Sequence, residues 1–345
     1  MLRGRARFRE PVVSVLLPVH NAASTLRAAI RSIQHQTLSD WELLVVDDGS
    51  TDGSAEAAAS QAAGDQRIVV LRQPHAGLVP ALEAGLQAAR GRYIARMDAD
   101  DISYPERLAL QVEYLNWNLD IGLVGGQVEF GGDAATNQGY ALHVDWINSL
   151  VKPADIALNR FIESPFAHPS VMFRHDLVDR HDGYRDGPFP EDYELWLRWL
   201  GAGVEMGKVP QRILIWNDSP ARLSRTDPRY DAEAFFEIKA GYLARAVKPL
   251  LKGRQLWVWG AGRPTRKRAE TLTQHGLKIH GYVDIDPEKC GKVLRGRQVA
   301  DPGQMPGPRE AMVLGYVTKR GARELIRAAL DDRGFTEGKD FWMAG

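Results

Sequence analysis

The chain has 345 residues and 44% of them are hydrophobic, so it is long enough for two domains that each bury a core. Its 44 basic residues balance 44 acidic ones, which excludes a strong overall attraction to nucleic acid or an anionic membrane. The single cysteine, Cys290, excludes a disulfide framework and a cysteine-rich metal site. No hydrophobic run is long enough to span a bilayer, so the sequence predicts a cytoplasmic protein.

The N-terminal stretch 1–10 is basic and lacks the hydrophobic centre of a signal peptide. Two interpretations remain open for it: a solvated tail, or a peripheral contact with lipid headgroups at the inner face of the membrane. The basic residues are Arg3, Arg5, Arg7 and Arg9.

The next 90 residues alternate between short β-branched runs and helical patterns. A first strand is predicted at Val12–Leu17, ended by Pro18, and a first helix at Ser24–Gln36. Because parallel strands need crossover connections, this alternation predicts an α/β fold with a mostly parallel sheet flanked by helices. The further predicted elements are strand 42–46, helix 54–63, strand 67–72, helix 79–89 and strand 92–97.

Polar clusters follow three of these strands, at 18–21, 47–50 and 98–101. Ligands of parallel sheets bind beyond the carboxyl ends of the strands, so one crevice can collect all three clusters. Asp48, which precedes a tight turn at Gly49, can accept hydrogen bonds from a base or ribose, or can form an Asx turn.

The third cluster contains three carboxylates within four positions: Asp98, Asp100 and Asp101. Like charges this close raise one another's pKa, so the cluster favours a hard cation, Mg²⁺ or Mn²⁺, shared with a phosphate. The alternative is a solvated acidic turn in which Asp101 caps a helix that starts near Pro105.

The stretches 13–21, 46–52 and 97–101 resemble those of family 2 glycosyltransferases with the GT-A fold, in order and spacing as well as in sequence. The resemblance implies binding of a nucleotide-activated sugar, with Mn²⁺ or Mg²⁺ as cofactor. Family members often carry Tyr where this chain has His20. The implied donor-nucleotide residues are Pro18, His20, Asn21, Asp48, Arg96 and Asp98, with Asp100 as the metal ligand.

The segment 189–198 resembles the Glu-Asp motif that the same family places at the start of a helix. Inverting sugar transfer needs a carboxylate that takes the proton from the attacking acceptor hydroxyl. We predict Asp192 as this base. In the alternative, Glu191 and Asp192 are only favourable charges in the first turn of an amphipathic helix.

Two further positions are candidates for contact with the acceptor or the phosphates, together with Glu191. His168 belongs to a segment, 167–174, that is similar to one in this branch of the family and is predicted to form a strand; a satisfied structural histidine is the alternative. Arg222 lies where relatives place a segment that closes on the diphosphate, which a guanidinium matches, although a solvated loop arginine is an equal alternative.

After Ala240 a second α/β pattern begins, which resembles a small Rossmann-like domain. A strand at 255–259 runs into Gly260-Ala261-Gly262, and a second strand ends at Asp284. Gly260, Gly262 and Asp284 therefore form a candidate second nucleotide site, although the third glycine of the fingerprint is missing. A docking or acceptor-positioning module is the alternative. The predicted organisation is a tail (1–10), a GT-A domain (11–240), a helical linker (241–253) and a Rossmann-like domain (254–345).

Two functions of different class remain. The first is an inverting, metal-dependent glycosyltransferase that moves a sugar from a nucleotide-sugar, for which a UDP-sugar is favoured, to a glycan, a lipid-linked acceptor or a glycoconjugate. The second is a nucleotide-binding or dinucleotide-binding protein, or an oxidoreductase, that acts through the Gly260–Gly262 loop. Metal dependence separates them, because only the first requires a divalent ion. Neither involves nucleic acid.

Overall fold

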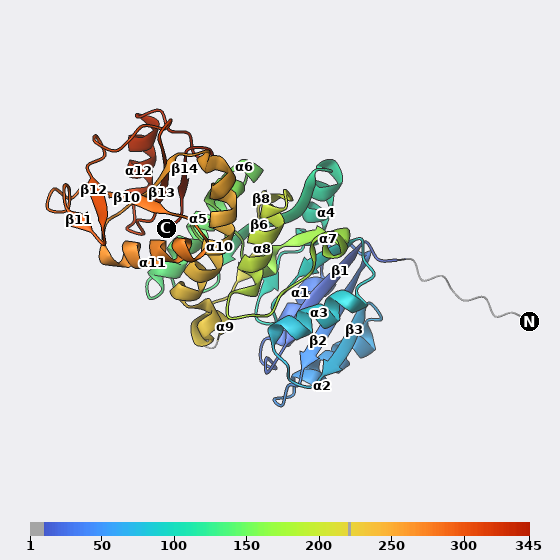
Figure 1. The fold of residues 1–345 in the computed structure, drawn as a ribbon. Coiled ribbons are helices and arrows are strands. Elements are labelled where there is room, and N and C mark those ends of the chain that lie inside the picture. The colour runs from blue at the N-terminus through green and yellow to red at the C-terminus, as the bar shows by residue number, and fades with distance from the viewer. Residues whose placement is uncertain (1–9, 220–221) are drawn as a thin grey trace, which may run out of the picture. The chain divides into compact units, whose positions relative to one another are not determined.

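The computed structural model describes residues 10–219 and 222–345, so most of the basic N-terminal stretch lies outside the described residues. The chain divides into two compact units (Figure 1). Unit 1 consists of Met1–Pro153, Phe166–Asp186 and Ala202–Arg222, and unit 2 of Ala154–Pro165, Gly187–Gly201 and Leu223–Gly345. No helix among the described residues has both the length and the hydrophobicity needed to cross a bilayer.

Unit 1 contains an eight-stranded sheet in the order β3-β2-β1-β4-β7-β6-β8-β5. The first four strands in that order are parallel, which confirms the predicted α/β architecture, while β7 runs antiparallel to β4 and β6. The strands are β1 (Val13–Val19), β2 (Trp41–Asp48), β3 (Ile68–Gln73), β4 (Tyr93–Arg96), β5 (Ile102–Ser103), β6 (Ile121–Phe130), β7 (Met172–Arg174) and β8 (Glu205–Trp216).

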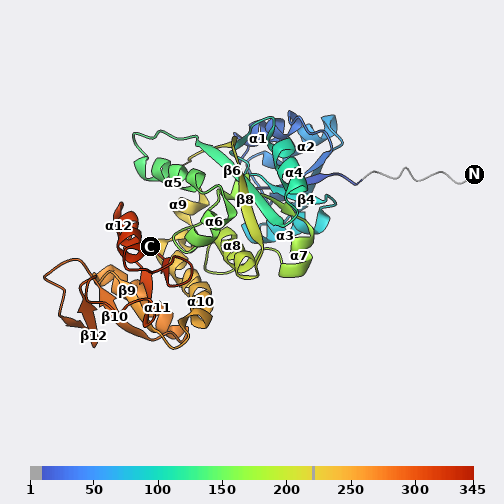
Figure 2. The same ribbon diagram turned by 90° about the horizontal axis from the view of Figure 1, so that it is seen from above.

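Helices cover both faces of this sheet, as a parallel sheet requires. Alternate residues of β1 and β2 pack in one core with hydrophobic side chains of α1, α2 and α4, whereas α3 contacts β1 and β2 through residues outside that core. Figure 2 shows α5 beside β6, which it contacts. The helices are α1 (Leu26–Gln34), α2 (Ser54–Gly64), α3 (Leu78–Ala88), α4 (Arg107–Trp117), α5 (Gln138–Ser149), the 3-10 turn η1 (His168–Ser170) and α7 (Asp176–His181).

Two predictions about strands in this unit are wrong. β1 does not end at Pro18 but continues to Val19, because β4 stops pairing with it at Leu16 and Pro18 then has a strand neighbour on one side only. Only the last three residues of the segment 167–174 form a strand, β7, since residues 168–170 form the turn η1.

Unit 2 contains a six-stranded sheet in the order β11-β12-β10-β9-β13-β14, parallel except for β11. Helices α10 and α11 lie on one face and α12 on the other (Figures 1 and 2). Its strands are β9 (Gln255–Trp259), β10 (Ile279–Val283), β11 (Val293–Leu294), β12 (Arg297–Ala300), β13 (Ala311–Gly315) and β14 (Phe341–Met343). Its helices are α6 (Pro153–Asn159), α8 (Glu191–Gly201), α9 (Leu223–Thr226), η2 (Pro228–Tyr230), α10 (Ala232–Leu251), α11 (Arg263–Gln274) and α12 (Ala322–Asp331).

The two units do not divide the chain at the predicted boundary near residue 240. Most of the stretch 241–253 is the second half of α10, and its Leu243, Ala244 and Val247 are buried in the core of unit 2. Helix α8 also belongs to unit 2, although it precedes residue 240. A helix that contributes this many side chains to a core is an integral element of its unit.

Candidate active site

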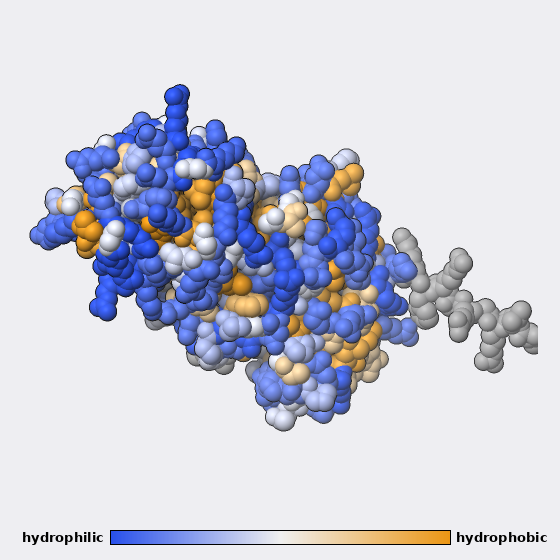
Figure 3. Space-filling view, viewed as in Figure 1, coloured by the Kyte–Doolittle hydropathy of each residue, from blue (hydrophilic) through white to orange (hydrophobic). Residues whose placement is uncertain are grey.

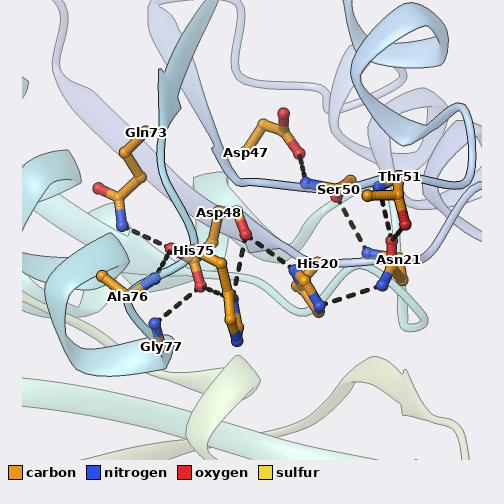
Figure 4. A network of polar contacts seen from close by, with 10 residues as sticks. All are labelled: His20, Asn21, Asp47, Asp48, Ser50, Thr51, Gln73, His75, Ala76 and Gly77. Atoms are coloured by element: carbon orange, nitrogen blue, oxygen red, sulfur yellow. Dashed lines mark hydrogen bonds and ion pairs between the residues drawn. The ribbon is translucent and has the colours of Figure 1, made fainter.

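Asp48, the last residue of β2, is held by four hydrogen bonds to its carboxylate (Figure 4). One oxygen accepts from Gln73 Nε2 (2.7 Å) and from the backbone nitrogen of Ala76 (2.9 Å), and the other accepts from His75 Nδ1 and from the backbone nitrogen of Gly77, both at 2.8 Å. Burial raises the pKa of Asp48, but these bonds outweigh it and leave the pKa below its ordinary value. The carboxylate therefore fixes the loop that follows β3.

Beside this carboxylate two imidazole rings are stacked. The rings of His20 and His75 lie 4.1 Å apart, 26° from parallel, and His20 Nδ1 donates to the carbonyl of Asp48 at 2.8 Å. Gly49 permits this arrangement: its φ is +70°, and a Cβ there would lie 2.7 Å from the backbone nitrogen of His75. The stacked pair presents an exposed flat surface at the carboxyl ends of β1 and β2.

Asn21 joins the ends of β1 and β2. It adopts a positive φ of 51°, its amide donates to His20 Nε2 at 3.0 Å, and its Oδ1 accepts from the backbone nitrogen of Thr51 at 2.8 Å. Its own backbone nitrogen donates to Ser50 Oγ. Two of the three predicted polar clusters thus meet at one edge of the sheet, and Pro18, the first residue of the first cluster, is still part of β1.

The third cluster brings together Asp98, Asp100 and Asp101, with one carboxylate oxygen of each within 4.8 Å of the others. Burial raises the pKa of Asp98, but the charges of Arg96, His168 and others outweigh this and lower it. The pKa values of the other two are raised by burial and then by neighbouring carboxylates, that of Asp101 well above its usual range. Such a cluster would gain from a cation that neutralises it.

Asp101 does not cap a helix, so that alternative is wrong. Helix α4 begins at Arg107, and Asp101 Oδ1 instead accepts from the backbone nitrogen of Asn217 at 2.8 Å. The side chain of Asn217 also donates to the carbonyl of Asp100 at 2.6 Å. In the described part of the chain, the second oxygen of Asp101 is buried without a hydrogen-bond donor, as an oxygen reserved for a cation would be.

Basic side chains surround the acidic cluster. The buried guanidinium of Arg96 pairs with Asp98, and Arg222, which lies over the ring of Trp216 at 4.4 Å, lowers the pKa of Asp98 and of Asp100 through its charge. His168 is buried, and its Nε2 lies 2.8 Å from the hydroxyl of Tyr184. The structure therefore groups Arg96, His168 and Arg222 with the carboxylates in unit 1.

The candidate base Asp192 lies in the first turn of α8, in unit 2, and is partly exposed. Its neighbour Glu191 is buried, and one of its oxygens accepts from the hydroxyl of Tyr230 at 2.6 Å. Of the two carboxylates in this motif, Glu191 is thus engaged inside the unit and Asp192 is the more accessible.

The Gly260-Ala261-Gly262 loop follows β9, and Gly260 has a φ of +111°. Asp284, after β10, uses both oxygens internally: one accepts from the backbone nitrogen of Ala261 at 2.8 Å and the other from that of Asp286 at 3.0 Å. Gly260, Gly262 and Asp284 therefore lie close together, and the carboxylate of Asp284 holds the loop through its hydrogen bond with Ala261.

Several residues of these arrangements were not predicted from the sequence. His75 lies on the loop after β3, Asn217 follows β8 and Tyr184 follows α7, each far in sequence from its partner. Arg107 was not predicted either; it lies eleven residues after the last residue of β4, in the first turn of α4.

Residues 14–181 match the model of glycosyl transferase family 2. The putative glycosyltransferase EpsE of Bacillus subtilis is 34% identical over 199 residues, which cover 56% of this chain and 68% of EpsE. The O-antigen biosynthesis glycosyltransferase WbnJ of Escherichia coli is 31% identical over 195 residues, covering 55% of this chain and 72% of WbnJ.

A third similar protein is the UDP-Glc:alpha-D-GlcNAc-diphosphoundecaprenol beta-1,3-glucosyltransferase WfgD of Escherichia coli, 30% identical over 195 residues, with 55% of this chain and 70% of WfgD covered. Among solved structures, residues 1–349 of TarS from S. aureus in complex with UDP-GlcNAc match 76% of this chain and 71% of that one, with a TM-score of 0.54 and 14% identity. The fold is therefore GT-A, and the chain belongs to glycosyltransferase family 2.

Proposed function

We propose that this glycosyltransferase takes its sugar from a nucleotide-sugar, and that the donor is a UDP-sugar. The observation that carries this proposal is the acidic cluster at the carboxyl end of β4, where one buried oxygen of Asp101 has no hydrogen-bond donor among the described residues. The cluster lies at the same edge of the sheet as the stacked rings of His20 and His75, because β1 and β4 are adjacent and parallel. A flat aromatic surface suits a base, and carboxylates suit the cation that accompanies a diphosphate. The names of WfgD and of the TarS complex both include a UDP-sugar, which supports this choice.

The oxygens of Asp98, Asp100 and Asp101 fit Mn²⁺ or Mg²⁺, because hard cations prefer several carboxylate ligands that converge on one point. Asp100 is the proposed metal ligand, and Asp98 is shared between Arg96 and the donor. A divalent ion bound there would supply charge stabilisation to the departing diphosphate. The guanidinium of Arg222 would bind the same diphosphate through paired hydrogen bonds.

We propose Asp192 as the base that accepts the proton of the acceptor hydroxyl while that oxygen attacks the anomeric carbon. The reaction would invert the anomeric configuration, because a single displacement forms the new bond on the face opposite the leaving diphosphate. Glycans and lipid-linked glycans are the proposed acceptors, since WbnJ is named for O-antigen biosynthesis and WfgD for a diphosphoundecaprenol acceptor.

The experiment is a donor screen that measures release of UDP from a panel of UDP-sugars with candidate acceptors. Asp192→Asn should lower turnover by about 100-fold or more, the contribution expected of a general base, while UDP binding is retained. Asp155→Asn is the matched control, because Asp155 is also a partly exposed carboxylate in the first turn of a helix, α6. Equal losses in both variants would contradict the role of Asp192.

We also propose that unit 2 includes a Rossmann-like module, residues 254–345, that docks or positions the acceptor. Five adjacent parallel strands with helices on both faces support the fold. Engagement of both Asp284 oxygens within the module supports docking over nucleotide binding. Peripheral attachment to a membrane would bring the enzyme to a lipid-linked acceptor.

A further inference from the structure

Arg107, in the first turn of α4, is completely buried, which is costly for a guanidinium. Its two terminal nitrogens donate to the carbonyl of Arg96 at 2.5 Å and to Ser103 Oγ at 2.9 Å, and its Nε donates to Gln111 Oε1 at 3.2 Å. None of these acceptors is a carboxylate. A neutral polar residue could satisfy such partners, so the presence of a full positive charge requires a separate reason.

The hydrogen bonds of Arg107 lie on both sides of the acidic loop, residues 97–101. Arg96 is the last residue of β4, directly before the loop, and Ser103 lies in β5, the strand that follows it. One rigid, planar guanidinium therefore fixes both ends of the segment that carries Asp98, Asp100 and Asp101. A lysine has the same charge, but its single ammonium lacks this fork.

The charge of Arg107 also has its partner in this loop. Burial lowers the pKa of Arg107 to about 9, and the charges of Asp101 and Asp98 oppose that decrease, so the guanidinium remains protonated near neutral pH. The positive charge of this buried guanidinium thus offsets part of the repulsion among the three carboxylates of the loop. Gln111 extends the support, because its Nε2 donates to the carbonyl of Ser170 at 2.9 Å, in the turn that contains His168.

We propose that Arg107 is a positioning residue that holds the acidic loop in the geometry that binds a divalent cation together with the donor diphosphate. This inference rests on the proposed function. It assigns to Arg107 the coupling between metal and nucleotide, because the proposed cation and the donor diphosphate would meet at this loop. The base platform of His20 and His75 is built on other elements, so binding of the nucleotide without metal should not depend on Arg107.

The test measures UDP binding by calorimetry with and without Mn²⁺, for the wild type and for Arg107→Lys, Ser103→Ala and Ser14→Ala. Arg107→Lys should reduce the gain in affinity that Mn²⁺ gives by about 10- to 100-fold, as loss of outer support does at metal sites, with metal-free binding unchanged. Ser103→Ala, which removes one of the two anchors, should reduce it in the same direction by less. Ser14→Ala is the matched control, since Ser14 is a buried hydrogen-bonded serine at the other end of β1.

An unchanged Mn²⁺ gain in folded Arg107→Lys and in Ser103→Ala would overturn the inference, as would equal weakening of UDP binding with and without metal. If Arg107→Lys does not fold, the gain in UDP affinity that Mn²⁺ gives to Ser103→Ala decides whether the inference holds. If the wild type binds no UDP with or without Mn²⁺, the proposed function itself is contradicted. That result differs from failure of the present inference, because it is seen in the wild-type titrations alone.

Discussion

At the scale of single residues, Asp48 organises the nucleotide side of the site without offering a free oxygen. Its four donors are the last residue of β3, Gln73, and three groups of the loop that follows, so the carboxylate places His75 against His20. The low pKa of Asp48 keeps its carboxylate ionised throughout the neutral range, so both oxygens can accept these four hydrogen bonds there. The role of Asp48 is to build the surface on which we expect the base to lie.

Gly49→Ala should disrupt this surface. The substitution introduces an unfavourable positive φ and a Cβ only 2.7 Å from the backbone of His75, so we expect a loss of about 1–3 kcal/mol in unfolding free energy and weaker UDP binding. Gly53→Ala is the matched control: its φ is also positive, +92°, but nothing lies within 4 Å of the new Cβ. Chemical denaturation and calorimetry of both variants check this. Equal UDP affinities in the two variants would count against the base platform.

At the scale of elements, α10 is anchored in unit 2 by a buried amine. Lys239 Nζ donates to the carbonyl of Ala344 at 2.8 Å and to that of Ile162 at 3.3 Å, so one side chain ties the helix to the segment after β14 and to the segment after α6. Burial lowers the pKa of Lys239 to about 7. The helix is therefore attached through a group that titrates near neutral pH.

This pKa predicts how the stability of unit 2 changes with pH. Between about pH 7 and pH 10 the unfolded chain binds the proton of Lys239 and the folded chain does not, so the unfolding free energy should rise with pH, by at most about 1.4 kcal/mol per pH unit. Lys239→Met should flatten this rise. Hydrogen exchange of the β9 and β13 amides at several pH values measures it, and an identical slope in wild type and variant would contradict the assignment.

The sequence was sufficient for the elements that repeat a local pattern and insufficient for those defined by distant partners. The parallel strands of unit 1 were predictable because each β-branched run is followed by a helical pattern and a polar turn. The turn at His168 and the full extent of α10 were not, because packing rather than local periodicity decides them. In the site, Asp98, Asp100 and Asp101 were evident as a motif, whereas Asn217 is 116 residues from the carboxylate it binds.

At the scale of the whole molecule, balanced charge and a mainly hydrophilic visible face give no sign of a broad membrane-binding surface (Figure 3). One corner of unit 1 is different. Trp117 and Leu119, at the end of α4, are 81% and 74% exposed, and Arg174 donates to the carbonyls of Leu115 and Asn118 beside them. An exposed Trp suits a bilayer surface, and the sequence also carries four arginines in the stretch 1–9.

We therefore expect the protein to bind vesicles that contain anionic lipid, and to bind them less at high salt, which screens the attraction. Trp117→Ser should weaken this binding several-fold, or about 1 kcal/mol, which is part of the roughly 1.5–3 kcal/mol that complete burial of a large apolar side chain contributes. Leu325→Ser is the control, since Leu325 is 71% exposed in unit 2. Vesicle co-sedimentation measures all three proteins. Equal binding to neutral and anionic vesicles would refute this expectation.

The central claim is that the acidic loop holds a divalent cation together with the diphosphate of a nucleotide. The most direct measurement is the anomalous scattering of Mn²⁺ in crystals grown with UDP. We predict an anomalous peak between the carboxylates of Asp98, Asp100 and Asp101, in contact with the UDP diphosphate. A peak at the other group of potential ligands, His20, Asp48 and His75, or UDP bound at the Gly260–Gly262 loop with the acidic loop empty, would contradict the account.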